Sequence, residues 1–125
     1  MIAGIGCDLV KVSRFEKWIK TSLIERFFNK KEILMGSCSL QHQCEHYAVR
    51  FAAKEAFSKA LGTGLTGFSL AEVYIKKNAY GKPFLYTEGK ADEALKKLCG
   101  TNAKIHVSLS HEKEYAMAYV IIEQE

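Results

Sequence analysis

The sequence lacks any long apolar run and any stretch of low complexity, and it holds a single proline among its 125 residues. No apolar stretch reaches the roughly 18–20 residues that cross a bilayer, so we expect no membrane partner. The first ten residues lack the basic leader of a signal peptide and place Asp8 within their apolar run. Without a linker or repeat, residues 1–125 are predicted to form one domain, and we expect it to be cytoplasmic.

Paired cysteine motifs are also missing, although the chain has four cysteines. None forms a CxxC pair, so the sequence predicts free thiols rather than disulfides. We expect Cys7 and Cys99 to be buried small hydrophobes, and Cys38 and Cys44 to be free thiols near a helix start.

Metal-ligand residue types crowd between residues 38 and 46, where His42 and His46 join two of the cysteines. The two histidines are four residues apart and share a helical face, but the spacing matches no structural zinc site. Our interpretation is that these histidines face solvent.

The excess of positive charge is modest, with 18 Lys and Arg against 14 Asp and Glu and a net charge of +4. Such an excess favours an anionic partner without identifying it. The sequence has no basic run or aromatic interleaving of the kind typical of nucleic-acid-binding proteins, so we expect no nucleic acid partner.

Basic residues do gather in segment 13–31, which includes Arg14 and Arg26. A charged run of this kind is most often a solvated face. Here aromatic residues such as Trp18 and Phe27 lie among the charges, and this mixture suits docking of an acidic protein surface.

The segment around residues 50–62 predicts a helix that ends at Gly62, because glycine tolerates left-handed cap geometry. Alanines and Phe57 recur at helical spacing and form one apolar stripe. Glu55 and Lys59, one turn apart, point the other way. A pair at this spacing is usually a solvated surface pair that contributes about 0.3–0.5 kcal/mol.

Residues 2–10 predict a buried strand that places Gly4, Gly6 and Asp8 on one face. The glycines are expected to leave space beside the aspartate. An ionised carboxylate in an apolar strand is costly unless a cation or hydrogen-bond donors meet it. Two interpretations remain: a cation partner, or backbone hydrogen bonds at the strand end.

The remaining elements follow from capping, turn and alternation patterns. Capping sequences at 13–16 and 29–32 predict two helix starts. The glycine-rich segment 62–67 follows a helix, whereas a dinucleotide-binding loop follows a strand, so such a loop is excluded. The other predicted segments are strands 68–77 and 84–86 around turn 78–83, helix 87–98, and strands 105–110 and 115–122 around turn 111–114. Residues 115–122 are apolar on both faces, so this strand is central or lies against another subunit.

Two carboxylates from different elements, Asp8 and Glu55, suit Mg²⁺, which typically takes one or two carboxylates and leaves other positions to water and phosphate. Lys59 suits the same phosphate, and His111 lies at a predicted turn. These residues indicate metal-assisted phosphate chemistry and no more.

Four blocks in order resemble the holo-[acyl-carrier-protein] synthase family of small phosphopantetheinyl transferases: GIGCDLVKVSRF at 4–15, RFAAKEAFSKALGTG at 50–64, NAYGKP at 78–83 and HVSLSHEKEYAMAYVIIE at 106–123. The resemblance implies an α+β phosphopantetheinyl-transferase-like fold, with a largely antiparallel sheet packed on a long central helix. It also implies a homotrimer with active sites at subunit interfaces.

The resemblance further implies that a serine of apo acyl carrier protein attacks the β-phosphate of coenzyme A. The products are holo carrier protein and adenosine 3′,5′-bisphosphate, in fatty acid biosynthesis. Asp8 and Glu55 would bind Mg²⁺ with the pyrophosphate, and Lys59 would contact that pyrophosphate. The general base would be a water on the metal or His111.

The same resemblance places Arg50 near the 3′-phosphate of the coenzyme, His111 close to the bound coenzyme, and the turn Gly81, Lys82 and Pro83 beside the adenine. Arg14, Trp18 and Arg26 would face the acidic carrier. Many relatives have basic residues where this chain has Gln41 and His42, so 3′-phosphate binding is expected to be weaker there or to come from elsewhere.

Two other classes of function remain open from the residues alone. One is a small module that binds a nucleotide or an acidic protein without turnover. The other is a metal-dependent nucleotide pyrophosphohydrolase, which needs no acceptor protein.

Overall fold

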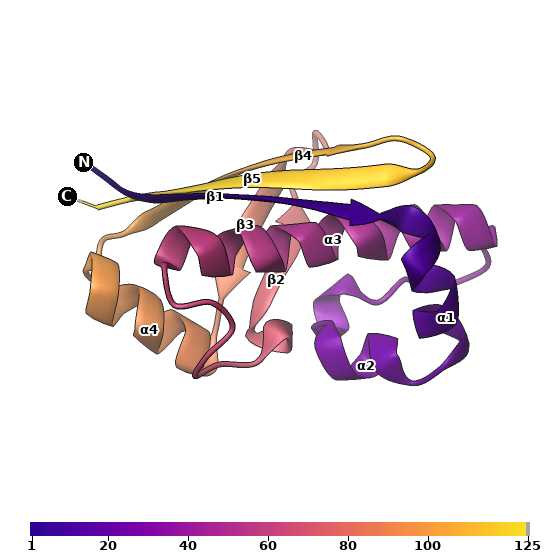
Figure 1. The fold of residues 1–125 in the computed structure, drawn as a ribbon, viewed down its shortest axis with the longest axis horizontal. Helices are drawn as coiled ribbons and strands as arrows, with labels where there is room; N and C mark the ends of the chain where they lie inside the picture. Colours follow the sequence, from indigo (N-terminus) through magenta and orange to yellow (C-terminus); the bar gives the residue numbers. More distant parts are fainter. Residues whose placement is uncertain (125) are drawn as a thin grey trace.

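A three-stranded antiparallel sheet covers one side of a long helix, α3 (Leu40–Leu61), as Figure 1 shows. The computed structural model describes residues 1–124. In the sheet, β5 (Tyr115–Glu123) lies between β1 (Ile2–Lys11) and β4 (Lys104–His111). The predicted α+β class, with antiparallel strands against a long helix, is confirmed.

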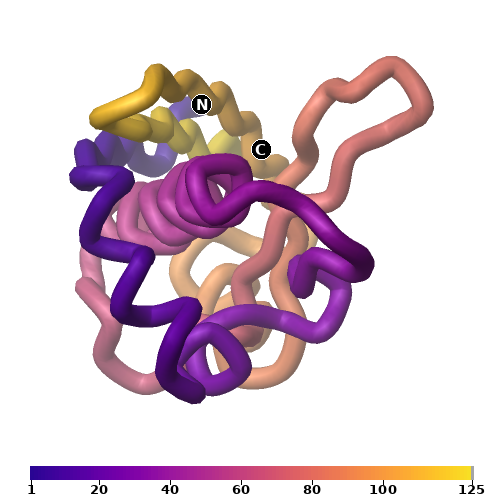
Figure 2. Tube along the Cα trace, turned by 90° about the vertical axis from the view of Figure 1, so that its right-hand side faces the viewer, coloured from indigo at the N-terminus to yellow at the C-terminus, as the bar shows by residue number. Residues whose placement is uncertain are grey.

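The other elements lie on the far side of α3 from the sheet or beside it (Figures 1 and 2). A second antiparallel pair, β2 and β3, forms a hairpin whose turn extends away from the body in Figure 2. The bounds of these elements are α1 (Phe15–Lys20), α2 (Leu23–Phe27), β2 (Val73–Lys77), β3 (Pro83–Thr87) and α4 (Gly89–Cys99), with 3₁₀ turns at Val12–Arg14, Lys30–Glu32 and Leu70–Glu72. Within residues 1–124, no helix is long and apolar enough to cross a membrane.

Strand β1 packs directly on the backbone of α3 through two glycines. A Cβ atom built on Gly4 would lie 1.8 Å from the carbonyl oxygen of Ala60, and one on Gly6 would lie 1.9 Å from that of Ala56. Any side chain there would collide with the helix backbone. The glycines therefore allow the helix to approach, and our prediction that they leave space beside Asp8 is wrong.

The outer face of the sheet points away from α3 and is exposed in the single chain. Ile5 and Leu9 of β1 are 63% and 61% exposed, and Tyr115 and Tyr119 of β5 are also exposed. The prediction of a buried β1 is therefore correct only for its inner face. For β5, the predicted central position is confirmed, because β1 and β4 pair with its two edges.

The buried surface of helix α3 is wider than the apolar stripe that the sequence predicted. Ala48, Phe51 and Ala52 lie on the side of the helix that carries Glu55, and all three are buried. The helix ends as predicted, with Gly62 in the left-handed region at φ 86°. Ser39 caps its start and accepts a hydrogen bond from the His42 backbone.

Four local predictions differ from the structure. Ser13 makes no cap, because Arg14 holds the capping position of α1 without a side-chain bond. The capping box at Asn29 forms as predicted but opens only a 3₁₀ turn, and the strand predicted from residue 68 begins at Val73. Of the cysteines, all free, Cys44 is buried, whereas Cys7 and Cys99, predicted to be buried, are half-buried.

Glu32 is the last residue of the 3₁₀ turn Lys30–Glu32 and lies buried in the core. Its carboxylate connects this turn to α3 and to β2. Its Oε1 accepts hydrogen bonds from Lys54 Nζ at 2.5 Å and from the Asn29 backbone at 3.1 Å. Its Oε2 accepts one from the Ile75 backbone at 3.0 Å. Lys54 Nζ also donates to the carbonyl oxygens of Leu70 and Val73. The pair therefore holds the segment before α3, and β2, against the helix.

Replacing Lys54 by Met should lower the free energy of unfolding by about 3–5 kcal/mol, because Glu32 would keep a buried charge without its cation. Lys96→Met is the matched control, since Lys96 forms an exposed pair with Asp92 at 2.8 Å; it should change the value by no more than about 0.5 kcal/mol. Urea denaturation of both variants measures the difference. Equal values for the two variants would contradict the role given to Lys54.

Candidate functional site

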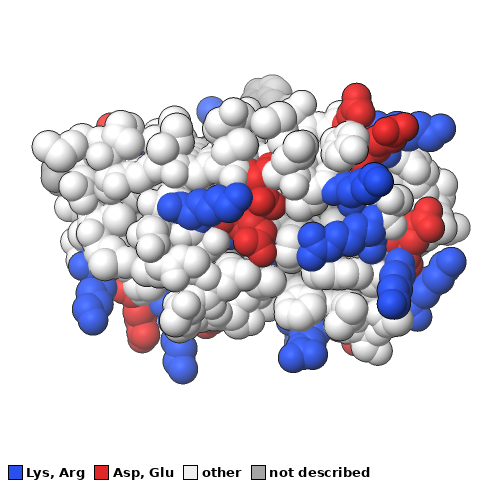
Figure 3. Space-filling view, viewed as in Figure 1, with Lys and Arg blue, Asp and Glu red and all other residues white. Residues whose placement is uncertain are grey.

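Asp8 and Lys59 meet where β1 crosses the last turns of α3. Lys59 Nζ donates to Asp8 Oδ1 and to the Cys7 carbonyl oxygen, both at 3.0 Å. The hydrogen bond that Lys59 donates to Asp8 raises the pKa of Lys59 above its ordinary value. In Figure 3, acidic and basic side chains adjoin near the middle of the face over these elements. Asp8 therefore has a cation partner, as one of our two interpretations required.

Glu55 lies half-buried one turn before Lys59. Burial raises the pKa of its carboxyl group, the nearby charge of Asp8 raises it further, and the charges of Lys59 and Arg14 partly oppose both effects. Lys59 pairs with Asp8 across the two elements, so the interpretation of Glu55 and Lys59 as a simple solvated pair on the helix does not hold. The structure thus brings the two predicted carboxylates and the lysine together.

This group offers two carboxylates to a cation, and no cluster of three or more His, Cys, Asp or Glu ligands occurs among residues 1–124. Two carboxylates fit Mg²⁺, which keeps several waters and uses substrate phosphate oxygens. A divalent cation here would also offset the repulsion that Asp8 exerts on Glu55. The donor set therefore fits the predicted magnesium.

A second set of predicted residues lines a cavity of about 340 Å³ between α3, the β2–β3 hairpin and the end of β4. Arg50, Gly81, Pro83 and His111 all lie on its wall, together with His42. Lys82 is not among the lining residues; its ammonium group lies 5.5 Å from the centre of the Phe84 ring.

Arg50 is the buried cation of this cavity. Burial lowers the pKa of its guanidinium group. Its Nη1 donates to the His46 carbonyl oxygen at 3.2 Å, but its Nε is buried with no hydrogen-bond partner. A buried donor without a partner is unusual, and an anion in the cavity would supply one.

Lys77 also lines the cavity, and the sequence analysis missed it. Lys77 pairs with Pro83 across the β2–β3 hairpin. Counting residues back from the turn at Gly81 gives the pairing of the two strands, and this pairing could have placed Lys77 opposite Pro83. Lys77 therefore adds positive charge close to His42, where basic residues were expected and are missing.

We predicted that His46 faces solvent, but it is mostly buried beside the cavity. Burial lowers the pKa of its imidazole to about 4, and the charge of Arg50 lowers it further. Its Nε2 donates to the Glu32 carbonyl oxygen at 2.7 Å. The ring is therefore neutral at physiological pH and fills part of the wall.

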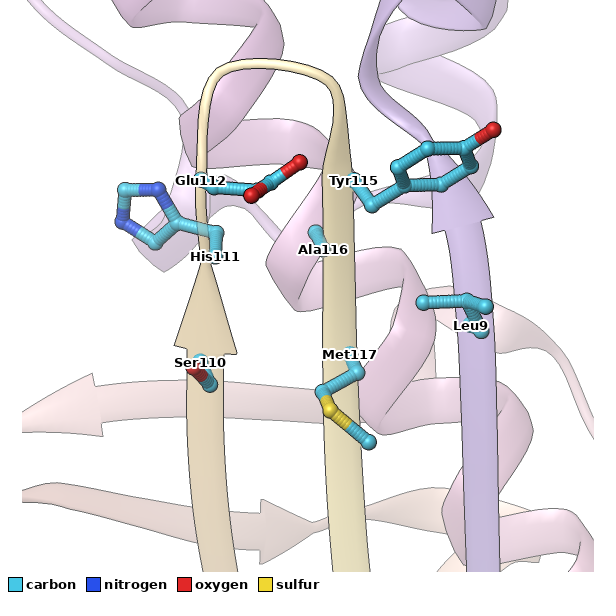
Figure 4. Close-up of a pocket in the computed structure, with 7 residues that line it drawn as sticks. All are labelled: Leu9, Ser110, His111, Glu112, Tyr115, Ala116 and Met117. Carbon is cyan, nitrogen blue, oxygen red and sulfur yellow. The ribbon is translucent and has the colours of Figure 1, made fainter.

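His111 ends β4, and its ring reaches the side of the sheet where α3 begins. Its Nδ1 lies 3.0 Å from Glu45 Oε1. His111 also borders a shallow hollow on the outer face of the sheet, and Figure 4 shows its ring extending away from Tyr115 and Leu9 there. The ring thus forms part of the wall of the cavity beside Arg50 and extends away from the middle of that hollow.

The carboxylate group and the cavity lie on opposite flanks of α3. On the inner face of the sheet, Ala118 of β5 has Asp8 of β1 on one side and Leu109 of β4, a cavity residue, on the other. Around the helix, Arg50 and Glu55 are about 140° apart, at 100° per residue. One chain therefore does not bring His111 and Arg50 next to Asp8 and Glu55.

The three residues predicted to face a carrier protein lie on one surface beside Glu55. The Arg14 guanidinium lies 5.4 Å from the Trp18 ring centre and 5.0 Å from that of Phe51. The Trp18 ring packs against Phe27 in a tilted arrangement, with ring centres 5.3 Å apart, and Arg26 lies over Phe27. Figure 3 shows basic side chains on this side of the molecule, where α1 and α2 lie.

Comparison with known proteins gives one consistent family. The model of the 4′-phosphopantetheinyl transferase superfamily matches residues 4–120. The chain is similar to a holo-[acyl-carrier-protein] synthase of Treponema denticola, with 51% identity over 124 residues that cover 98% of this chain and 99% of the relative. A synthase of Treponema pallidum is 44% identical over 126 residues, which cover 100% and 98%.

Among solved structures, the fold is similar to that of a holo-(acyl-carrier-protein) synthase from Bacillus anthracis in complex with CoA (3′,5′-ADP). The TM-score is 0.79 at 36% identity, with 100% of this chain and 99% of the other covered. The chain therefore belongs to the 4′-phosphopantetheinyl transferase superfamily and, within it, to the holo-[acyl-carrier-protein] synthase family.

Proposed function

We propose that the protein transfers the 4′-phosphopantetheine group of coenzyme A to a serine of apo acyl carrier protein in the cytoplasm. The products would be holo carrier protein and adenosine 3′,5′-bisphosphate, for fatty acid biosynthesis, and residues 1–125 would act as a single transferase domain. The observation that carries this proposal is the Asp8, Lys59 and Glu55 group beside a basic and aromatic surface.

Asp8 and Glu55 would hold Mg²⁺, which when bound neutralises pyrophosphate charge and polarises the phosphate under attack. Lys59, whose side chain is 53% exposed next to Asp8, would turn toward a pyrophosphate oxygen. Transfer of a phosphoryl-type group depends chiefly on positioning and charge neutralisation, and these residues supply both.

The cavity would hold the adenosine end of the coenzyme. Arg50 and Lys77 would meet the 3′-phosphate, which would give the buried Arg50 Nε its missing partner. Gly81 and Pro83 would border the adenine, with Lys82 at the same turn. His111 would lie close to the bound coenzyme and, with Asp8, Glu55 and Lys59, make up the catalytic group.

A complete site would need two copies of the chain, because the cavity and the carboxylate group lie on opposite flanks of α3. The exposed apolar residues Ile5, Leu9, Tyr115 and Tyr119 on the outer sheet face give a second copy a surface to cover. A homotrimer would pair the flank of one subunit with the opposite flank of the next.

The serine hydroxyl would attack the β-phosphorus while the bond to the adenosine bisphosphate breaks and the leaving oxygen keeps the electron pair. Glu55 would be engaged as a ligand, so the hydroxyl proton would leave to His111 or to a water.

Mass spectrometry of apo acyl carrier protein after incubation with the protein, coenzyme A and Mg²⁺ tests the proposal. A gain of about 340 Da, the mass of one phosphopantetheine arm joined by phosphoryl transfer, is the expected result. Cleavage of coenzyme A without any carrier would favour a pyrophosphohydrolase. Binding with neither cleavage nor mass gain would favour a non-enzymatic module.

Glu55→Gln should abolish transfer, because the amide cannot replace the charged oxygen that a divalent cation requires. The matched control is Glu93→Gln, an exposed glutamate on α4 that should transfer at the native rate. If purified Glu55→Gln still modifies carrier protein at the native rate with Mg²⁺ present, the assignment of the metal to this group is wrong.

The same variant should melt about 1–3 °C higher than the native protein at pH 7 without Mg²⁺. The raised pKa of Glu55 means that its ionised form opposes folding, so the native protein loses stability as pH rises above about 4.3, the ordinary glutamate value. The difference between the two proteins should vanish below that pH. Mg²⁺ should then raise the melting temperature of the native protein alone.

Arg14→Ala should raise the apparent KM for carrier protein about tenfold and weaken its salt dependence, because a charge that steers an acidic partner would be lost. The KM for coenzyme A should not change. Lys90→Ala, on the distant helix α4, is the control for loss of one positive charge. An unchanged KM for the carrier in Arg14→Ala would remove the docking role.

A further inference from the structure

Glu45, in the second turn of α3, lies between the helix and the β4–β5 hairpin, and both of its carboxylate oxygens have partners. Oε1 meets His111 Nδ1 at 3.0 Å, and Oε2 accepts a hydrogen bond from Gln41 Nε2 at 2.9 Å. Gln41 Nε2 also donates to the Lys113 carbonyl oxygen in the hairpin turn, at 3.0 Å. Three contacts therefore fix the Glu45 carboxylate relative to the hairpin.

The contact determines which ring nitrogen of His111 carries the proton. An ionised carboxylate only accepts hydrogen bonds, so His111 Nδ1 is the donor. In the neutral ring, Nε2 then keeps its lone pair. His111 and Glu45 both line the cavity beside Arg50, so the ring that carries this lone pair forms part of the cavity wall.

We propose that Glu45 is a positioning residue that holds His111 in the Nδ1–H form and presents Nε2 as the proton acceptor at the coenzyme cavity. The inference rests on the proposed transferase function. When the serine oxygen bonds to phosphorus and the bond to the bisphosphate breaks, the hydroxyl proton passes to Nε2. The Glu45 carboxylate stabilises the imidazolium that results.

Positioning matters here because the His111 side chain is 44% exposed and stands at the end of a strand, next to an exposed turn. Such a ring could rotate or exchange tautomers in water. Glu45, which is 23% exposed, supplies the fixed partner, and Gln41 holds the carboxylate from the other side. This pairing gives the neutral Gln41 a function at a place where a basic residue was expected.

Nitrogen NMR of the four histidines tests the tautomer without any activity assay, with His111 assigned by comparison with His111→Gln. The native protein should show His111 protonated at Nδ1. Glu45→Ala should shift the population toward the Nε2–H form, whereas Glu45→Gln should keep Nδ1–H, because its amide oxygen still accepts. An unchanged tautomer in Glu45→Ala would overturn the proposal.

Steady-state kinetics supply the second measurement. Glu45→Ala should lower kcat on the order of tenfold or more with little change in the KM for coenzyme A, and Glu45→Gln should fall between it and the native protein. Glu114→Ala, which removes an exposed charge from the same hairpin turn, should keep the native kcat. A kcat within twofold of native in Glu45→Ala would also overturn the proposal.

The two proposals fail in different ways. Absence of transfer by the native protein would overturn the transferase function, while the tautomer measurement would still decide whether Glu45 orients His111. Native transfer together with an unaffected Glu45→Ala would overturn only the role of Glu45.

Discussion

The close contact between β1 and α3 determines where every acidic group of the candidate site lies. Gly4 and Gly6 bring the strand onto the carbonyl oxygens of Ala60 and Ala56, with no side chain between them. At this separation, Asp8, two residues beyond Gly6 on the same face, comes within 3.0 Å of Lys59. A larger residue at either glycine would push the strand away and separate the carboxylates. The chemistry proposed for this site therefore depends on the packing contact between β1 and α3.

This arrangement has an electrostatic consequence for stability. Asp8 and burial both raise the pKa of Glu55, so the protein keeps an ionisable group where its charged form opposes folding. The buried pair of Glu32 with Lys54, the residue just before Glu55 in the helix, is different because hydrogen bonds from the Asn29 and Ile75 backbones to Glu32 satisfy it. One residue of the helix thus belongs to a hydrogen-bonded structural pair, and the next is an acidic group whose charged form is disfavoured by burial and by Asp8. A group left in this condition is typical of a functional site.

The sequence predicted those parts of the fold that depend on local pattern. The end of α3 at Gly62, the alternation of β4 and the central place of β5 follow from glycine chemistry and from strand periodicity. The prediction of a cap at Ser13 was wrong because a 3₁₀ turn precedes α1. The prediction of a strand from residue 68 was wrong because Ser69 and Glu72 form a capping box there instead. Contacts between residues far apart in sequence depend on tertiary packing and could not be predicted. They are the contacts of Glu32 with Lys54 and of Glu45 with His111, and the meeting of Lys77 with Arg50 in one cavity.

The position of α3 across the inner face of the sheet explains why the candidate site is divided. The helix covers Ala116, Ala118 and Val120 of β5, so only the sheet edges are open to a substrate. The acidic group lies at the β1 edge and the basic cavity at the β4 edge. If the pyrophosphate of the proposed coenzyme binds at the acidic group and its 3′-phosphate in the basic cavity, the two groups cannot belong to one chain, because α3 lies between them. The apolar outer face, which is exposed in the single chain, would allow two such edges to come together if a second copy of the chain covered it.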